Sequence, residues 1–100
     1  MQVDVIALTE TWLTPDVADT EIQLNDFKLF RADRSSNRMG GGVLLYCRSS
    51  LRPSLVKSLS DASSNEEFVS CRTRLSDVSG SAEIAVLYRP PIDHPKRMVN

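Results

Sequence analysis

The chain has 100 residues, 41% of them hydrophobic, so it can bury one modest core and is too short for two domains. Its 12 basic and 13 acidic residues give a net charge of −1, which excludes a global positive field that draws the chain to nucleic acid. The N-terminal residues read neither as a signal peptide nor as a membrane span, so no membrane partner is expected.

The first expected element is a strand at residues 3–8, a nearly continuous run of Val, Ile, Ala and Leu. Such a run predicts a central strand that is buried on both faces. Because a compact domain rarely opens on a central strand, we expect that a further strand precedes it. Residues 9–16 follow as a turn that Pro15 keeps out of any sheet, and Glu10 stands at the exit of the strand.

The middle of the chain predicts two strands that flank a polar loop. Residues 27–30 alternate apolar and polar side chains, and residues 31–38 have loop composition with three arginines, Arg31, Arg34 and Arg38. Three glycines at 40–42 then allow unusual backbone conformations or the close approach of a neighbour. Residues 43–47, Val-Leu-Leu-Tyr-Cys, are typical of a strand.

The last part of the chain predicts three more strands, at 51–59, 67–75 and 82–88. Pro53 interrupts the first of them, and the polar residues 58–67 predict a solvated turn. The second alternates with period two, which predicts one buried face. Taken together, the pattern indicates mostly antiparallel strands joined by short turns, as in half of a sandwich.

The two cysteines, Cys47 and Cys71, are too few for a disulfide framework and lack the spacing of a metal site. We therefore expect two buried thiols in a reducing compartment, the nucleus or the cytoplasm.

Four short motifs occur in one order along the chain. They are Asp-Val-Ile-Ala-Leu-Thr-Glu-Thr-Trp-Leu at 4–13, Arg-Ala-Asp-Arg at 31–34, Gly-Gly-Gly-Val-Leu-Leu-Tyr at 40–46 and Leu-Tyr-Arg-Pro-Pro at 87–91. Their order and spacing resemble the endonuclease/exonuclease/phosphatase (DNase I-like) family, and more narrowly its branch in non-LTR retrotransposons. The resemblance extends from Val3 to Pro91.

The resemblance implies an α/β fold, a four-layer sandwich in which helices flank two packed sheets. On that reading, residues 1–100 are a partial domain that supplies mainly the strands of the N-terminal half and lacks the first strand and the C-terminal half. The implied function is Mg²⁺-dependent hydrolysis of phosphodiester bonds, which nicks DNA so that the 3′ hydroxyl primes reverse transcription. The implied partners are DNA, the missing half of the domain and a reverse transcriptase region of the parent polyprotein.

The resemblance also assigns site residues. Glu10 matches the glutamate that holds the catalytic Mg²⁺, a hard cation that prefers carboxylate oxygen. Tyr88 matches the tyrosine that contacts the scissile phosphate or the attacking water, although core packing alone would also explain it. Arg34, Arg38 and Arg89 are candidate contacts to DNA phosphates, and a solvated loop is the alternative for them.

The sequence departs from the family in several places. Pro91 stands where the family often has asparagine, the Asp-x-Asn motif is missing, and His94 lies in a polar tail unmatched to the family's C-terminal histidine motif. Because these motifs supply a base and electrostatic stabilisation, we expect the isolated chain to be inactive. Two alternatives stay open, a non-enzymatic transposon remnant and a phosphodiesterase that acts on phosphoesters other than DNA.

Overall fold

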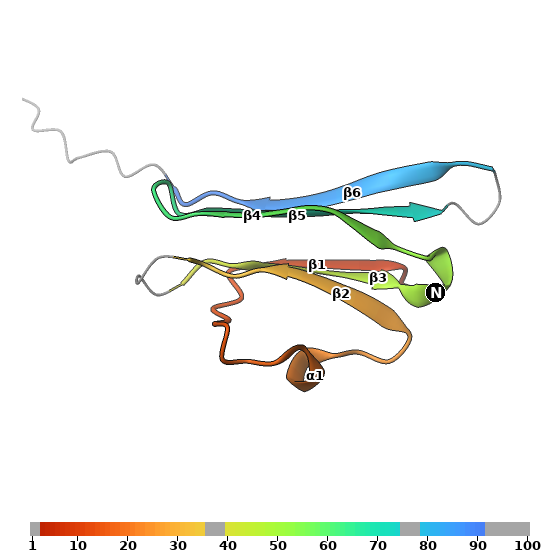
Figure 1. Ribbon diagram of the computed structural model, residues 1–100, viewed down its shortest axis with the longest axis horizontal. Helices are drawn as coiled ribbons and strands as arrows, with labels where there is room; N and C mark the ends of the chain where they lie inside the picture. Colours follow the sequence, from red (N-terminus) through yellow and green to blue (C-terminus); the bar gives the residue numbers. More distant parts are fainter. Residues whose placement is uncertain (1–2, 36–39, 75–78, 92–100) are drawn as a thin grey trace, which may run out of the picture.

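The computed structural model describes residues 3–35, 40–74 and 79–91, which form two three-stranded antiparallel sheets (Figure 1). The strand order is β1-β3-β2 in the first sheet and β4-β5-β6 in the second. The elements are β1 (Val5–Thr9), α1 (Asp19–Ile22), β2 (Phe27–Ala32), β3 (Val43–Arg48), the 3₁₀ turn η1 (Ser49–Leu51), β4 (Ser54–Asp61), β5 (Glu66–Arg74) and β6 (Ser81–Tyr88).

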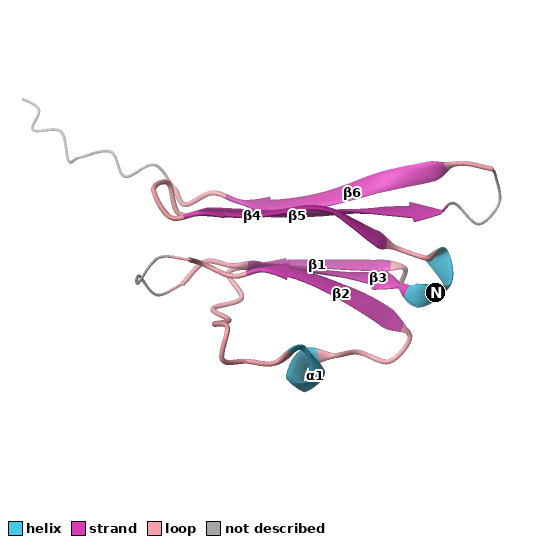
Figure 2. Ribbon diagram, in the orientation of Figure 1, coloured by secondary structure: helices cyan, strands magenta, loops and turns pink. Residues whose placement is uncertain are grey.

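The two sheets lie one above the other, and the core fills the space between them (Figure 2). The central strands β3 and β5 supply most of the fully buried side chains, including Leu45, Cys47, Val69 and Cys71. Burying an aliphatic side chain of the size of Val or Leu contributes about 1.5–3 kcal/mol. The packing of β3 against β5 therefore supplies much of the stability of the sandwich.

Strand β5 shows how the sequence pattern produces this packing. Successive side chains of a strand point to opposite faces, so every second residue of β5 faces the other sheet. Val69, Cys71 and Thr73 are buried, whereas Arg72 and Arg74 are exposed. The alternation predicted for this segment is confirmed.

The expected α/β class is wrong. Within the described residues the helical elements are the single turn α1 and the 3₁₀ turn η1, and no layer of helices covers either sheet. Antiparallel neighbours need only short turns between them, whereas helical layers require long crossover connections. The strand pairs β4–β5 and β5–β6 are consecutive antiparallel neighbours and leave no room for such a connection, so the fold is nearly all β.

The expectation of a central first strand is also wrong. Strand β1 lies at the edge of its sheet, pairs with β3 alone among the described strands, and is half-buried to exposed. Strand β3 is buried from Val43 to Cys47, because β1 and β2 flank it and the second sheet covers it. Pro53 precedes β4 rather than interrupting it, and the turn expected at 58–67 shrinks to residues 62–65. No described helix is long and apolar enough to cross a membrane.

Candidate functional site

The ends of five segments meet at one end of the sandwich. They bring together Glu10 after β1, Arg34 after β2, Gly42 before β3, Glu67 in β5 and Tyr88 at the end of β6. We call these five residues the Glu10–Tyr88 cluster. The two residues that the motifs nominate as catalytic, Glu10 and Tyr88, therefore lie together although they are far apart in sequence.

Glu10 is held in an unusual backbone conformation. Glu10 and Trp12 have φ angles of 57° and 58°, in the left-handed region that costs L-residues about 1–2 kcal/mol. Contacts with residues 40–42, which we call the glycine segment, compensate for that cost. Trp12 N–H donates to the Gly41 carbonyl at 2.9 Å, and Gly41 N–H donates to Glu10 Oε1 at 3.2 Å. Strain of this kind often marks a functional site.

The glycine segment can approach its neighbours because it lacks side chains. Gly41 and Gly42 have φ angles of +71° and +92°. A Cβ atom on Gly41 would lie 2.3 Å from the Arg34 guanidinium, and one on Gly42 would lie 2.5 Å from Thr11 Oγ1. Only glycine fits both the conformation and the space, as the triple-glycine motif predicted.

Glu67 is a buried carboxylate that is only 1% exposed. Arg34 Nε donates to it at 3.2 Å and Gly42 N–H donates to it at 2.7 Å, so its charge is paired and hydrogen-bonded. The Arg34 side chain is itself only 11% exposed and also donates to the Asn65 carbonyl at 3.2 Å. Arg34, expected to contact DNA, is therefore engaged inside the protein.

Sequence reasoning missed Glu67, although a signal was present. Glu67 stands two residues before Val69 and four before Cys71, so it shares the buried face of β5. An acid on the buried face of a strand requires a partner, because an unpaired buried charge is very costly. That partner, Arg34, comes from the loop after β2 and could not be identified by spacing.

Tyr88 lies opposite Glu67 in the β5–β6 pairing, and the Arg34 guanidinium lies over its ring at 5.9 Å. The pKa of Tyr88 is raised above its ordinary value of 10.0, mainly by a side-chain hydrogen bond to Glu10 and then by desolvation. The negative charge of Glu10 adds to the shift, and Arg34 opposes it. The phenol therefore stays protonated and can donate a hydrogen bond.

The other nominated arginines lie differently. Arg89 pairs with Glu66 at 2.7 Å, and its side chain is 63% exposed, so it is accessible at the rim of the cluster. Arg38 lies outside the described residues. Trp12 is 55% exposed and lies close to Gly40, where an added Cβ would meet its ring at 3.5 Å.

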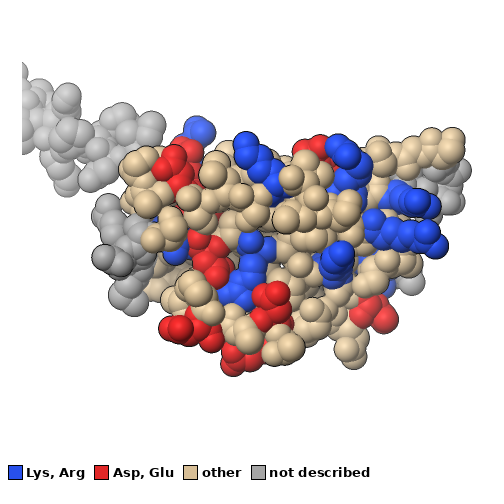
Figure 3. Space-filling view, in the orientation of Figure 1, with Lys and Arg blue, Asp and Glu red and all other residues tan. Residues whose placement is uncertain are grey.

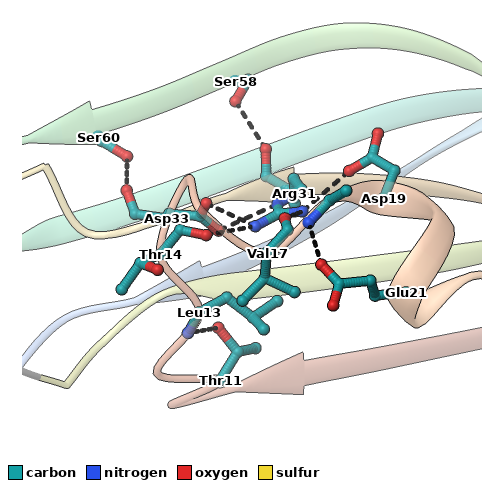
Figure 4. Close-up of polar contacts among 11 residues, drawn as sticks. Thr11, Leu13, Thr14, Val17, Asp19, Glu21, Arg31, Asp33, Ser58 and Ser60 are labelled. Carbon is teal, nitrogen blue, oxygen red and sulfur yellow. Dashed lines mark hydrogen bonds and ion pairs between the residues drawn. The ribbon is translucent and has the colours of Figure 1, made fainter.

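Arg31 holds the loop before α1 against β2 (Figure 4). Its guanidinium pairs with Asp33 at 2.8 Å and with Asp19 at 2.9 Å, and donates to the carbonyls of Thr14 and Val17. The hydrogen bond to Asp33 is the main cause of a raised Arg31 pKa. These contacts give Arg31 a structural role.

The carboxylates of the cluster are too few to enclose a divalent cation. Within residues 3–35, 40–74 and 79–91, no three acidic, histidine or cysteine side chains gather closely enough to hold a metal ion. Glu67 is occupied by Arg34 and Gly42, which leaves Glu10 as the exposed carboxylate of the cluster. Mg²⁺ is usually held by one or two carboxylates together with substrate phosphates, so a single free carboxylate does not by itself form a metal site.

Compared with protein-family models, with curated proteins and with solved structures, the chain matches none of them. The chemistry of the cluster must therefore be argued from its own residues.

The Tyr88–Glu10 contact makes a testable prediction. In a Tyr46→Phe background, which leaves Tyr88 as the remaining tyrosine, we expect Glu10→Ala to lower the pKa of Tyr88 toward its ordinary value. The ultraviolet absorbance of the phenolate measures this pKa. The pKa of Tyr88 is higher in the folded protein than in the unfolded chain, so the contact stabilises the fold. This stabilisation is fully present below pH ~10, the ordinary pKa of tyrosine, and it is lost as the pH rises through the higher pKa of the folded protein. An unchanged pKa in Glu10→Ala, or an equal shift in Glu66→Ala, would contradict the contact.

Proposed function

We propose that this chain is part of a Mg²⁺-dependent endonuclease that hydrolyses phosphodiester bonds in DNA. The observation that supports the proposal is the geometry of the cluster. Glu10 is an exposed carboxylate held by the Gly41 N–H at 3.2 Å, and the Tyr88 ring lies in the same cluster under the Arg34 guanidinium, at 5.9 Å. The proposal depends on these residues and not on an α/β fold, which this protein does not have.

Each residue of the cluster has a role in this proposal. Mg²⁺ at Glu10 would neutralise the negative charge of a phosphate. Tyr88 would donate the single hydrogen bond of its phenol to a phosphoryl oxygen in place of its present acceptor, Glu10. Arg34 and Glu67 are positioning residues: their ion pair fixes the glycine segment and the Tyr88 ring.

The described part of the site has few of the groups that phosphodiester hydrolysis needs. In the part of the chain that the structure describes, no histidine stands near Tyr88 as a base, and no third acidic group completes a metal site. Proper placement of a base and of electrostatic groups supplies much of the rate of hydrolysis. The proposal therefore expects weak metal binding and little or no nicking of DNA by the chain alone.

The deciding experiment locates the metal. Mn²⁺ can replace Mg²⁺, and its unpaired electrons broaden the NMR signals of nearby amides. We expect Mn²⁺ to broaden Gly41, whose N–H contacts Glu10, and expect Glu10→Gln to weaken the effect about tenfold or more, in line with the loss of a metal ligand's charge. Glu66→Gln is the matched control, since Glu66 is also a carboxylate but pairs with the exposed Arg89.

Plasmid nicking with Mg²⁺ and hydrolysis of a synthetic phosphodiester complete the test. No Mn²⁺ effect near Gly41, or an equal effect in Glu10→Gln, would overturn the metal assignment. The chain could instead hydrolyse the synthetic diester in a reaction that Glu10→Gln abolishes, and yet not nick DNA. That result would overturn DNA as the substrate. Strong nicking that Glu10→Gln abolishes would support the endonuclease and show that the cluster suffices for activity.

A further inference from the structure

A second candidate site lies at the opposite end of β5 from Glu67. It is a pocket of about 280 Å³ lined by Arg52, Ser54, Arg72, Thr73, Arg74 and Ser81. We call it the arginine pocket. Arg74 lies seven positions after Glu67 along β5, roughly 23 Å at ~3.3 Å per residue, so the pocket is distinct from the Glu10–Tyr88 cluster.

The register of the second sheet explains why the pocket exists. Strand β4 begins at Ser54, which pairs with Arg72, so β5 extends two residues further, to Arg74. On its other side, β5 stays paired with β6 through Arg74 and Ser81. Arg52 has a φ of 51° at the end of η1 and turns the chain into β4, which leaves the β4 side of the last residues of β5 open.

The pocket concentrates positive charge and hydroxyl groups. Figure 3 shows Lys and Arg side chains gathered toward the end of the molecule where β5 ends and η1 lies. Ser54 and Ser81, which pair with Arg72 and Arg74 and are exposed, add hydroxyl groups to the lining. The protein as a whole has a net charge of −1, so this positive charge is local to the pocket.

Among the described residues, one carboxylate pairs with an arginine of the pocket. Arg72 pairs with Glu83 at 3.5 Å, and both side chains are about half-exposed, so this pair is weak. Among the described residues, no carboxylate forms an ion pair with Arg52 or Arg74. Several guanidinium groups around one open space repel one another unless an anion lies between them.

We propose that the arginine pocket binds a phosphate group. Guanidinium groups stay charged at physiological pH and donate paired hydrogen bonds that match phosphate oxygens, and the hydroxyl groups offer further donors. The phosphate belongs either to inorganic phosphate or to the backbone of a nucleic acid, which share this chemistry. The inference does not depend on the proposed function, because none of the pocket's residues belongs to the Glu10–Tyr88 cluster.

Titration with inorganic phosphate, followed by amide NMR shifts, tests the pocket. We expect the shifts to map to Ser54, Thr73 and Ser81, and expect Arg74→Gln to weaken binding about tenfold or more, as for the loss of a charged hydrogen bond. Arg74→Lys should lose part of the affinity, since it keeps the charge but not the paired donors. Lys57→Gln is the control, because Lys57 is exposed on β4 and does not line the pocket.

The amide spectrum of each variant also shows whether it remains folded, so a loss of binding can be separated from a loss of structure. A short single-stranded oligonucleotide without terminal phosphates provides the second arm. Displacement of phosphate by the oligonucleotide assigns the pocket to a nucleic acid backbone, and lack of displacement assigns it to free phosphate. Shifts that map elsewhere, or equal affinities for Arg74→Gln, Lys57→Gln and the unsubstituted chain, would overturn the proposal.

Discussion

Glu67→Ala is expected to lower the free energy of unfolding by about 3–5 kcal/mol, the usual cost of removing one partner of a buried ion pair. Without the Glu67 carboxylate, Arg34 stays 11% exposed with its charge no longer balanced by Glu67, and the Gly42 N–H loses its acceptor. Two segments of the first sheet thereby lose their polar link to β5. Urea denaturation followed by circular dichroism measures the loss.

Two variants distinguish this effect from a general loss of charge. Glu66→Ala removes the adjacent carboxylate, which pairs with the exposed Arg89, and should cost only about 0–1 kcal/mol. Glu67→Gln keeps an acceptor for Gly42 N–H and should cost less than Glu67→Ala. Equal costs for Glu66→Ala and Glu67→Ala would show that the Arg34–Glu67 pair does not hold the sheets together.

Oxidation of Cys47 and Cys71 to a disulfide is expected to raise the free energy of unfolding by about 3 kcal/mol, from the entropy of closing a loop of this length. The two sulfur atoms lie 3.0 Å apart, one on each central strand, and both residues are buried. Each thiol would lose its hydrogen as the sulfurs join, while an added small-molecule disulfide is reduced to two thiols. The bond would link β3 to β5 across the core.

Burial controls how fast this oxidation occurs. Desolvation is the main cause that raises the pKa of Cys47 to about 12, so little reactive thiolate forms in the folded protein near neutral pH. We expect slow oxidation of the folded chain and faster oxidation during refolding with glutathione disulfide. Thiol titration and denaturation midpoints measure both effects, with Cys71→Ala as the control that cannot form the bond. A lower stability of the oxidised protein would show that the strands cannot accommodate the disulfide.

The sequence pattern was sufficient to predict most strands. The apolar run at 43–47 and the alternation from residue 67 depend on local features, side-chain direction and β propensity, which short segments carry by themselves. The same holds for the glycines at 40–42, whose positive φ angles need no distant partner to be favoured. The resemblance failed for the fold class because the helical layers it implied are not encoded in the local pattern of these residues.

Part of the candidate site could also be predicted. The motifs nominated Glu10 and Tyr88, which lie in the same cluster, and their catalytic roles stay predictions. Arg34 was nominated for DNA, but its partner Glu67 lies 33 residues away in another sheet and engages it. Sequence spacing cannot show which buried acid meets which arginine, because that depends on how the two sheets are stacked.

The sequence by itself determined where strands form, where prolines and glycines end them, and which residues could bear chemistry, since these depend on interactions between near neighbours. Only the tertiary structure decided that β1 is an edge strand, that Glu67 is buried with Arg34, that Cys47 faces Cys71 and that three arginines line one pocket. The physical reason is that strand order and sheet stacking are fixed by long-range packing, which minimises exposed apolar surface over the whole chain.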